Sequence, residues 1–288
     1  ARDLAGGQPL HVAAASGHAT VVDLLLGLRA ALNVENGDSM HPLHAAASRG
    51  HHTVLTLLVG QRAALVARNK HGEQPLQLAA NFGDAAAVEL LVDLRSDVSA
   101  RNKLGMQAMH SAVVKGHNSV VEALARRRSS VEAEIIQGDQ KGWRPLHQAA
   151  GRGHTAVVKA LLDARAATGA RTKGGMQALH HAAVAGHVGT VRQLVVNRCD
   201  VHATNEDGGQ PLHAAVAQGH LSVVQALVAL GAQSPPAVWR ELAQFSRKSG
   251  RRALGDFLDT LVGGTGSRQQ RQRRNRASKR RGTGTMEL

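Results

Sequence analysis

Aromatic residues are nearly absent from this chain. Among its 288 residues there is no Tyr, and only three Phe and two Trp are present. Hydrophobic residues nevertheless make up 43% of the chain, so a core can form from Ala, Val and Leu. Because such small side chains pack well only where backbones come close together, the composition predicts closely spaced elements.

Cysteine and long apolar runs are scarce as well, and each absence excludes a class of protein. The only cysteine, Cys199, excludes an internal disulfide and a cysteine-based zinc site, and it favours a reducing compartment. No run approaches the roughly 18–20 apolar residues that span a bilayer. No signal-peptide pattern is present, and because the chain begins at Ala1 rather than Met we expect further sequence upstream. We expect a cytoplasmic or nuclear protein.

Positive charge is abundant and unevenly distributed. The net charge is +14, and residues 263–288 supply half of it with eight cations and one acidic residue. We name these eight cations the basic tail: Arg268, Arg271, Arg273, Arg274, Arg276, Lys279, Arg280 and Arg281. The charge density and lack of apolar residues predict disorder. Such a tail is typical of a nuclear-localisation signal or a nucleic-acid contact, and a simple role in solubility is the alternative.

One motif recurs along most of the chain. The letters GGQPLH stand at 6–11 and again at 208–213. The motif Pro, or the Ala that replaces it, recurs every 33 residues except for one interval of 37. These positions are Pro9, Pro42, Pro75, Ala108, Pro145, Ala178 and Pro211. A fixed period of this length predicts a solenoid of stacked units.

Each copy predicts two short helices. Pro suits the first turn of a helix, where its missing N–H is no loss, and a Gly such as Gly17 ends the helix after about two turns. A second stretch, such as VVDLLL at 21–26, has an apolar face at helical spacing. A Gly before the motif predicts a tight turn. Because two such helices cannot bury their apolar faces alone, neighbouring copies must stack.

A 33-residue period with PLHxAA, GH and VVxxLL resembles the ankyrin repeat, in seven copies over residues 5–233. The resemblance implies an all-α solenoid of helix-turn-helix units with β-hairpin-like fingers. We expect an array over 1–233, with one finger lengthened by four residues near 134–140. Residues 234–262 predict a helical cap, and the basic tail follows at 263–288. No cap pattern precedes Leu10, which again suggests missing upstream sequence.

Seventeen histidines invite a metal-binding or acid–base hypothesis, but twelve of them occupy two fixed places in the repeat. The motif histidines are His11, His44, His110, His147, His180 and His213, and the histidines after the helix-ending Gly are His18, His51, His117, His154, His187 and His220. The resemblance implies that both sets hydrogen-bond backbone groups. The adjacent pairs His51–His52 and His180–His181 are the alternative metal candidates, although side chains one apart on a helix do not face the same point. We expect no catalytic, cofactor-binding or metal-binding residue.

An arginine follows the second helix where the family favours Gly, because the chain turns there through a left-handed conformation. These residues are Arg29, Arg62, Arg95, Arg128, Arg165 and Arg198, and we name them the basic edge. The strain of a non-Gly residue, roughly 1–2 kcal/mol, is partly offset because a cation suits a helix C-terminus. The edge is either a solvated surface or a contact for an acidic or phosphate-bearing partner. Gln before the motif Pro also departs from the family's Thr and is a poorer helix cap.

Partners of this family usually contact the concave face, which consists of finger tips and first helices. The residue two before the motif Pro is large and apolar in four copies, at Met40, Met106, Trp143 and Met176. Near the end of the first helices we place Phe82, Arg49, Lys115 and Arg152, with Gln148 and His181 one turn earlier. Met adapts its shape to a partner and Trp is enriched at binding hot spots, so these ten residues are the predicted protein-binding patch.

Three functions follow from these patterns. The first is a non-enzymatic scaffold, monomeric by itself, that binds a protein partner through the patch. The alternative is an RNA-associated subunit that places the basic tail and basic edge on phosphate. The third is an enzyme whose catalytic domain lies outside this stretch, since the chain supplies no nucleophile, phosphate loop or metal set.

In the cap, we expect one apolar face of Val238, Leu242 and Phe245 and another of Leu254, Phe257, Leu258 and Leu261.

Overall fold

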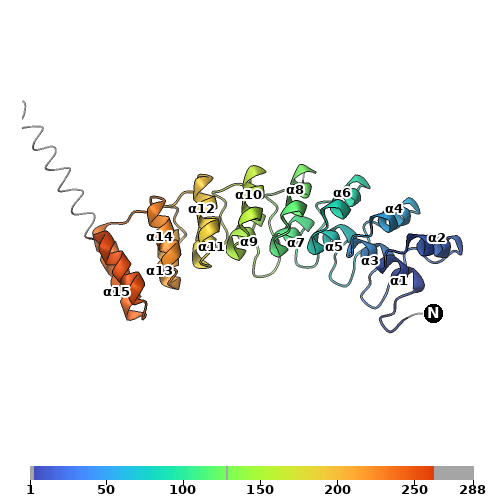
Figure 1. Cartoon of the computed structure of the whole chain (residues 1–288), viewed down its shortest axis with the longest axis horizontal. Coiled ribbons are helices and arrows are strands. Elements are labelled where there is room, and N and C mark those ends of the chain that lie inside the picture. The colour runs from blue at the N-terminus through green and yellow to red at the C-terminus, as the bar shows by residue number, and fades with distance from the viewer. Residues whose placement is uncertain (1–2, 128, 263–288) are drawn as a thin grey trace, which may run out of the picture.

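The computed structural model describes residues 3–127 and 129–262, and within them the chain is helical with no strand. The helices form antiparallel pairs that stack side by side into an elongated row (Figure 1). The first helices are α1 (Pro9–Ala15), α3 (Pro42–Ala47), α5 (Pro75–Phe82), α7 (Ala108–Lys115), α9 (Pro145–Arg152), α11 (Ala178–Val184) and α13 (Pro211–Gln218). The second helices are α2 (Ala19–Gly27), α4 (His52–Gly60), α6 (Ala85–Asp93), α8 (Asn118–Arg126), α10 (Thr155–Asp163), α12 (Val188–Val196) and α14 (Leu221–Ala229). The predicted all-α solenoid is confirmed.

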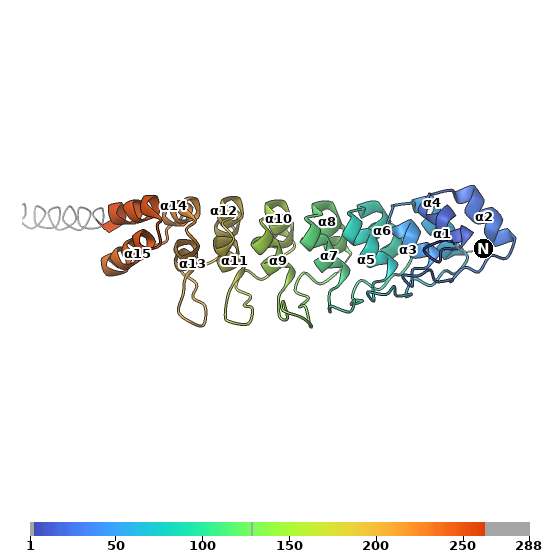
Figure 2. The same cartoon turned by 90° about the horizontal axis from the view of Figure 1, so that it is seen from below.

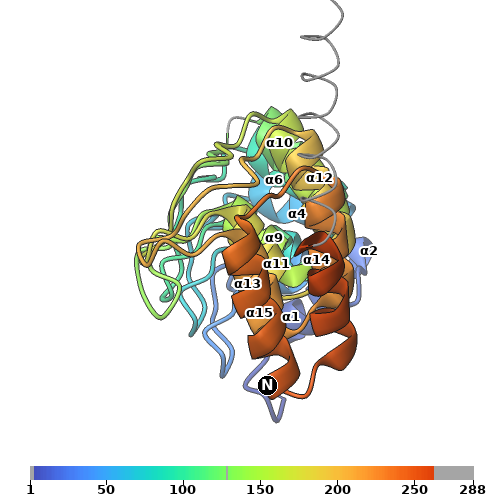
Figure 3. The same cartoon turned by 90° about the vertical axis from the view of Figure 1, so that its left-hand side faces the viewer.

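The segments between the pairs form a second feature of the row, which we call the fingers. Figure 2 shows them on the side of the first helices, with the second helices lying farther away. Seen along the row in Figure 3, the fingers project together from one side. Their turns use the predicted left-handed glycines, for example Gly72 and Gly105, with φ values of +75° and +73°. Ser39 adopts the same conformation in place of Gly, with φ +54°.

A core of small side chains runs through the whole row. The residue after the motif Pro or Ala is fully buried in each pair, at Leu10, Leu43, Leu76, Met109, Leu146, Leu179 and Leu212. Ala pairs on the first helices, such as Ala149 and Ala150, are completely buried against the neighbouring first helices. Because Ala lets helices approach closely, the nearly aromatic-free composition suits this stacked arrangement.

The glutamines before the motif Pro have a role that the sequence did not predict. None of their side chains caps its helix by accepting from the helix backbone. Instead, Gln107 Nε2 donates to the carbonyl of Ser99 at 3.1 Å, and Gln74 Nε2 donates to the carbonyl of Val66 at 3.4 Å. These two glutamines therefore tie the start of a first helix to the segment that leads into its finger.

The basic edge adopts the strained backbone expected of it. Arg29, Arg62, Arg95, Arg165 and Arg198 have φ between +61° and +71°, and Gly231 takes the corresponding place after α14. Arg128 lies outside the described residues. All five side chains are exposed, and within the described part of the chain none of them forms an ion pair with a carboxylate. The chain thus keeps five arginines in a conformation that suits Gly better.

The C-terminal cap covers the last repeat with a different face from the one predicted. It consists of α15 (Pro236–Lys248) and a helical stretch at 252–262. The buried face of α15 is Trp239, Ala243 and Ser246. Of the predicted face, Leu242 packs against the core and Val238 is half-buried, but Phe245 is 47% exposed, so its predicted burial is wrong. Leu254 and Leu258 are buried as expected, with Phe257 and Leu261 half-buried. The stripes that contain Trp239 and Phe245 are adjacent on α15, and the one that contains Trp239 packs against the preceding repeat.

Candidate protein-binding surface

The motif histidines join neighbouring repeats, as predicted. His110 shows the pattern: its Nδ1 accepts from the backbone N–H of Gln107 at 3.1 Å, and its Nε2 donates to the carbonyl of Ala133 at 2.9 Å. Because a backbone N–H can only donate, the ring must carry its proton on Nε2. His11, His44, His147 and His180 make the same pair of bonds. Gln77 replaces this His in one copy, and its side-chain amide makes both bonds.

The second set of histidines lies at the turn between the two helices. His51, His117, His154 and His220 each donate from Nε2 to a carbonyl of the preceding repeat. In the cap, Arg251 takes this place and donates to the carbonyl of Val216 at 3.0 Å. These histidines are therefore parts of the scaffold, joining each repeat to the one before it.

Buried titratable groups in the array are held in unreactive forms. Burial lowers the pKa of His44 and of His110 to about 4, so both rings are neutral at pH 7. Burial raises the pKa of the Cys199 thiol to about 12, which leaves little reactive thiolate. Within residues 3–127 and 129–262, no group of three His, Cys, Asp or Glu side chains is placed to hold a metal ion.

Finger turns are held by a residue whose role the sequence analysis missed. Asn102 Oδ1 accepts from the backbone N–H groups of Leu104 and Met106, both at 3.0 Å. Asn36 and Asn69 hold their turns in the same way. A recurring Asn before a turn is a recognisable signal, because its side chain can accept from the backbone two residues later. In the long finger (134–143), Ile135 stands at this place and is buried instead.

The four apolar residues predicted at the finger tips do not lie at the outermost turns. Met40, Met106, Trp143 and Met176 follow the turns and are half-buried beside the first helices. The carbonyl of Met106 accepts from Asn102 N–H at 2.9 Å, so this residue closes the turn rather than forming its tip. These side chains are therefore only partly exposed, because the returning arm of each finger brings them back to the helices.

The long finger covers two residues that were predicted to face a partner. Its ring lies 4.2 Å from the ring of His181 and 6.4 Å from that of His147, measured between centroids. Gln148 donates from Nε2 to Gln140 Oε1 of the long finger at 2.9 Å. Gln148 is fully buried and His181 only 9% exposed, so their predicted direct contact with a partner is wrong. Burial and the neighbouring His147 and His180 lower the pKa of His181 to about 4.

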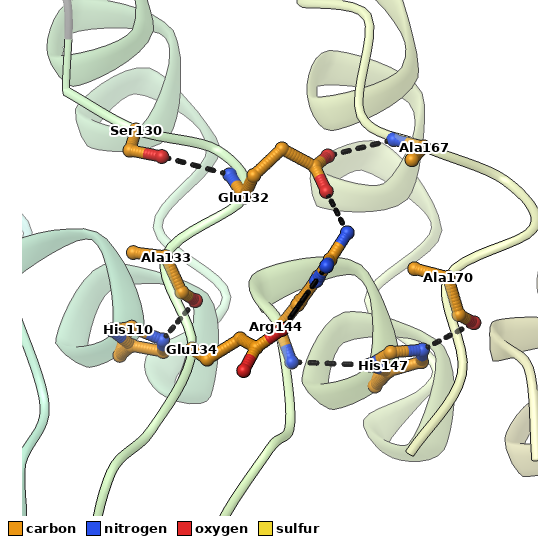
Figure 4. Close-up of polar contacts among 9 residues, drawn as sticks. All are labelled: His110, Ser130, Glu132, Ala133, Glu134, Arg144, His147, Ala167 and Ala170. Carbon is orange, nitrogen blue, oxygen red and sulfur yellow. Dashed lines mark hydrogen bonds and ion pairs between the residues drawn. The ribbon is translucent and has the colours of Figure 1, made fainter. Parts of the chain in front are cut away.

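An ion-pair network fixes the base of the long finger (Figure 4). Arg144 donates from Nη1 to Glu132 and from Nη2 to Glu134 Oε1, the latter at 3.0 Å. Glu132 also accepts from the backbone N–H of Ala167 in the next repeat at 2.7 Å. Burial acts to lower the pKa of Arg144, but its bonds to Glu134 and Glu132 outweigh this effect and raise that pKa. The network anchors the base of the long finger to the start of α9 and to the segment that follows α10.

The accessible part of the predicted patch is a row at the ends of the first helices, which we name the first-helix strip. It consists of Arg49, Phe82, Lys115 and Arg152, all exposed. Phe82 ends α5 with 60% of its surface exposed, beside a depression of ≈ 480 Å³ that Arg49 and Asp84 also line. Among the described residues, no carboxylate forms an ion pair with the three cations of the strip.

Comparison with known families matches this arrangement. The model of the family described as ankyrin repeats (3 copies) matches residues 10–102, 76–171 and 153–238. The chain belongs to the ankyrin repeat family. Ankyrin repeat domains are generally protein-interaction modules and are typically non-enzymatic.

Two solved ankyrin repeat domains resemble this one. The domain of Bcl-3, described as a unique member of the IkappaB protein family, is 28% identical with a TM-score of 0.67, over 77% of this chain and 99% of that one. The domain of human ASB11 is 25% identical with a TM-score of 0.70, over 80% of this chain and 100% of that one. No curated protein matches the chain. Within the described part of this ankyrin array, no helix has the length and apolar content needed to cross a bilayer.

Proposed function

We propose that this ankyrin array is a non-enzymatic scaffold that binds a partner protein through the first-helix strip and the adjoining fingers. The exposed ring of Phe82, in a row with three cations that form no ion pair among the described residues, is the observation that supports this function. A large aromatic side chain left in water is unfavourable, and a ring bordered by cations suits a partner that presents an apolar residue beside carboxylates. The half-buried Met40, Met106 and Met176 lie on the adjoining fingers and can adapt to such a partner.

Replacing Phe82 with Ala is expected to lower partner capture at least about tenfold, because truncating a central aromatic anchor typically costs about 2 kcal/mol or more of binding. The measurement is affinity capture from cell extract with the intact chain, quantified by mass spectrometry. The matched control is Val196→Ala, since Val196 is 74% exposed on a second helix, away from the strip. Both variants should keep the helical circular-dichroism signal. Equal capture by the Phe82 variant and the control would exclude the strip as the binding surface.

A second candidate function, RNA association, is favoured by the basic edge. Five exposed arginines recur once per repeat without a carboxylate partner in the described residues, although Gly would relieve their backbone strain. Guanidinium groups bind phosphate well, and such contacts are independent of base sequence. The basic tail would add eight cations, and it lies outside the residues that the structure describes.

Replacing the five edge arginines together with Gly is expected to have two opposite effects. Each substitution should raise the unfolding free energy by up to about 1 kcal/mol, because Gly adopts positive φ without strain. Affinity for oligouridylate should fall, because fewer cations then neutralise its phosphates. The slope of log affinity against log salt should become shallower by about 0.7 for each phosphate that the variant no longer neutralises.

Filter binding with a chain that ends at Gly263 measures the affinity of the basic edge for oligouridylate in the absence of the basic tail. The Arg→Lys variant at the same five positions keeps both the charge and the strain, so it should bind oligouridylate nearly as the parent does. Unchanged RNA affinity in the Gly variant would leave the edge as a solvated surface only.

A further inference from the structure

Neighbouring fingers are joined by backbone hydrogen bonds at most junctions. At four junctions a backbone N–H in one finger turn donates to a carbonyl in the turn of the preceding finger. The bonds run from Gly37 to Ala5 at 2.8 Å, from Lys70 to Asp38 at 2.9 Å, from Lys103 to His71 at 3.0 Å and from Glu206 to Gly174 at 3.1 Å. The fingers thus form a ladder in which each turn supports the next one.

This ladder is interrupted after the long finger. Among the described residues, no backbone hydrogen bond joins the long finger to the finger at 171–176, although Lys173 occupies the donor position used at the other junctions. A Cβ added to Gly72 would meet the backbone N of Lys103 at 3.0 Å, whereas one added to Gly142, at the corresponding place, would have no atom within 4 Å. Gly208, whose finger is the last in the row, is equally open. The junction between the finger at 102–106 and the long finger also lacks the bond. The two fingers are nevertheless close there, because a Cβ added to Gly105 would lie 3.0 Å from the backbone N of Ile136.

The four extra residues explain the interruption, because the arm of the lengthened finger that returns to α9 is held by the first helices, while residues 136–139 at its end stay exposed. Gln140 accepts a hydrogen bond from Gln148 of α9, and the ring of Trp143 lies against that of His181 of α11, tilted by 46°. Gly151 of α9 lies beside this ring, since a Cβ added there would be at an ordinary contact distance of 3.8 Å from Trp143 Cζ3. The long finger is therefore held by helix contacts instead of by the next finger.

A cleft of ≈ 920 Å³ lies at the interruption. Trp143 lines it together with Lys141 and Asp139 of the long finger, Lys173 and Gly174 of the next finger, and Glu206 beyond it. The two lysines and two carboxylates balance in charge, so the cleft does not suit a polyanion such as RNA. The cleft places the Lys173 N–H, which has no partner among the described residues, beside the Trp143 ring. This pair suits a peptide segment whose backbone is uncharged and which carries an apolar side chain.

We propose that an extended segment of a partner protein inserts between these two fingers, accepts a hydrogen bond from the Lys173 N–H and places an apolar side chain against Trp143. An unpaired backbone edge is a template for another extended chain, and in such pairing the main chain supplies affinity while alternate side chains supply specificity. The segment would restore the missing rung of the ladder. This proposal rests on the proposed scaffold function and assigns the partner a linear element in addition to the surface that meets the first-helix strip.

Trp143 offers a direct readout of this binding. The chain has two tryptophans, and Trp239 is buried in the cap, so Trp239→Phe leaves Trp143 as the only indole. In that background we would select from a phage library of linear twelve-residue peptides on the intact chain, then titrate the synthesised peptides by Trp143 fluorescence. Linear peptides that change the Trp143 emission on saturable binding are the expected result.

Two substitutions at one position separate backbone pairing from charge. Lys173 is the first central residue of a turn closed by a hydrogen bond from Gly175 N to the Thr172 carbonyl, a place that accepts Pro. Lys173→Pro removes the N–H and should lower peptide affinity at least tenfold, whereas Lys173→Gln keeps the N–H and should stay within threefold of the parent. Methylation of the peptide's own amide nitrogens should also weaken binding, because it removes the remaining backbone pairing.

Three outcomes would overturn the proposal: no linear peptide is selected, the selected peptides leave Trp143 emission unchanged, or Lys173→Pro binds as well as Lys173→Gln. A dimer of the chain that dissociates in Lys173→Pro would also overturn it and would place a second copy in the cleft. If the proposal fails while Phe82→Ala still loses its partner, the scaffold function stands without a linear element. If capture is unaffected in both series, the scaffold function fails with it.

Discussion

Acidification from pH 7 to about 5 is expected to lower the unfolding free energy of the array by several kcal/mol. His44, His110 and His181 are buried with pKa values of about 4, whereas the ordinary value is 6.5. As the pH falls below 6.5, the unfolded chain takes up protons at these three sites and the folded chain does not, so unfolding becomes more favourable. Each group contributes about 1.4 kcal/mol per pH unit, and three contribute about 4 kcal/mol per unit, against a typical domain stability of about 5–15 kcal/mol. Urea unfolding at a series of pH values measures the slope.

The chain itself provides the control for this acid sensitivity. Gln77 occupies the motif-histidine place in one repeat and makes both backbone bonds with an amide that does not titrate. The double variant His44→Gln and His110→Gln should therefore fold at pH 7 and should lose about two thirds of the slope that the three buried rings contribute between pH 6.5 and 4. A slope equal to that of the parent would show that other groups dominate the acid response.

Replacing His110 with Leu is expected to lower the unfolding free energy at pH 7 by about 2–5 kcal/mol. Leu fills similar space but leaves the Gln107 N–H and the Ala133 carbonyl without partners, and each buried unsatisfied group costs about 1–3 kcal/mol. His110→Gln restores both partners and should remain within about 1 kcal/mol of the parent. Denaturant unfolding of the two variants measures the difference. A Leu variant as stable as the Gln variant would show that the histidine acts by packing alone.

Residues that repeat were predictable in both structure and role. The motif histidines recur in one register with different neighbours, which argued against a catalytic site, and the structure confirms that they bind backbone carbonyls. The basic edge was predictable for the same reason: its place after a short helix calls for positive φ in every copy, and five described arginines adopt it. In such places the local chain and its nearest neighbour determine the conformation, and the sequence contains both.

Residues that depart from the repeat were predicted less well. Trp143, Gln148 and His181 were expected to face a partner, but the long finger folds onto α9 and α11, so Gln148 and His181 are buried and Trp143 is half-buried. In the cap, Phe245 and Trp239 lie on adjacent stripes of α15, and a helical pattern does not show which stripe meets the preceding repeat. Both errors concern contacts between segments that no periodic signal relates.

The sequence by itself determined the stacked helical pairs, the structural role of the histidines and the arginine edge, because the repeat specifies similar contacts between similar neighbours at six junctions. Only the tertiary structure decided where the four extra residues go. Residues 136–139 at the end of the finger are exposed, whereas burial of Ile135 and the contacts of Gln140 and Trp143 hold the two arms of the finger against the helices. That choice opens the finger ladder at Lys173, and it depends on packing between non-equivalent segments.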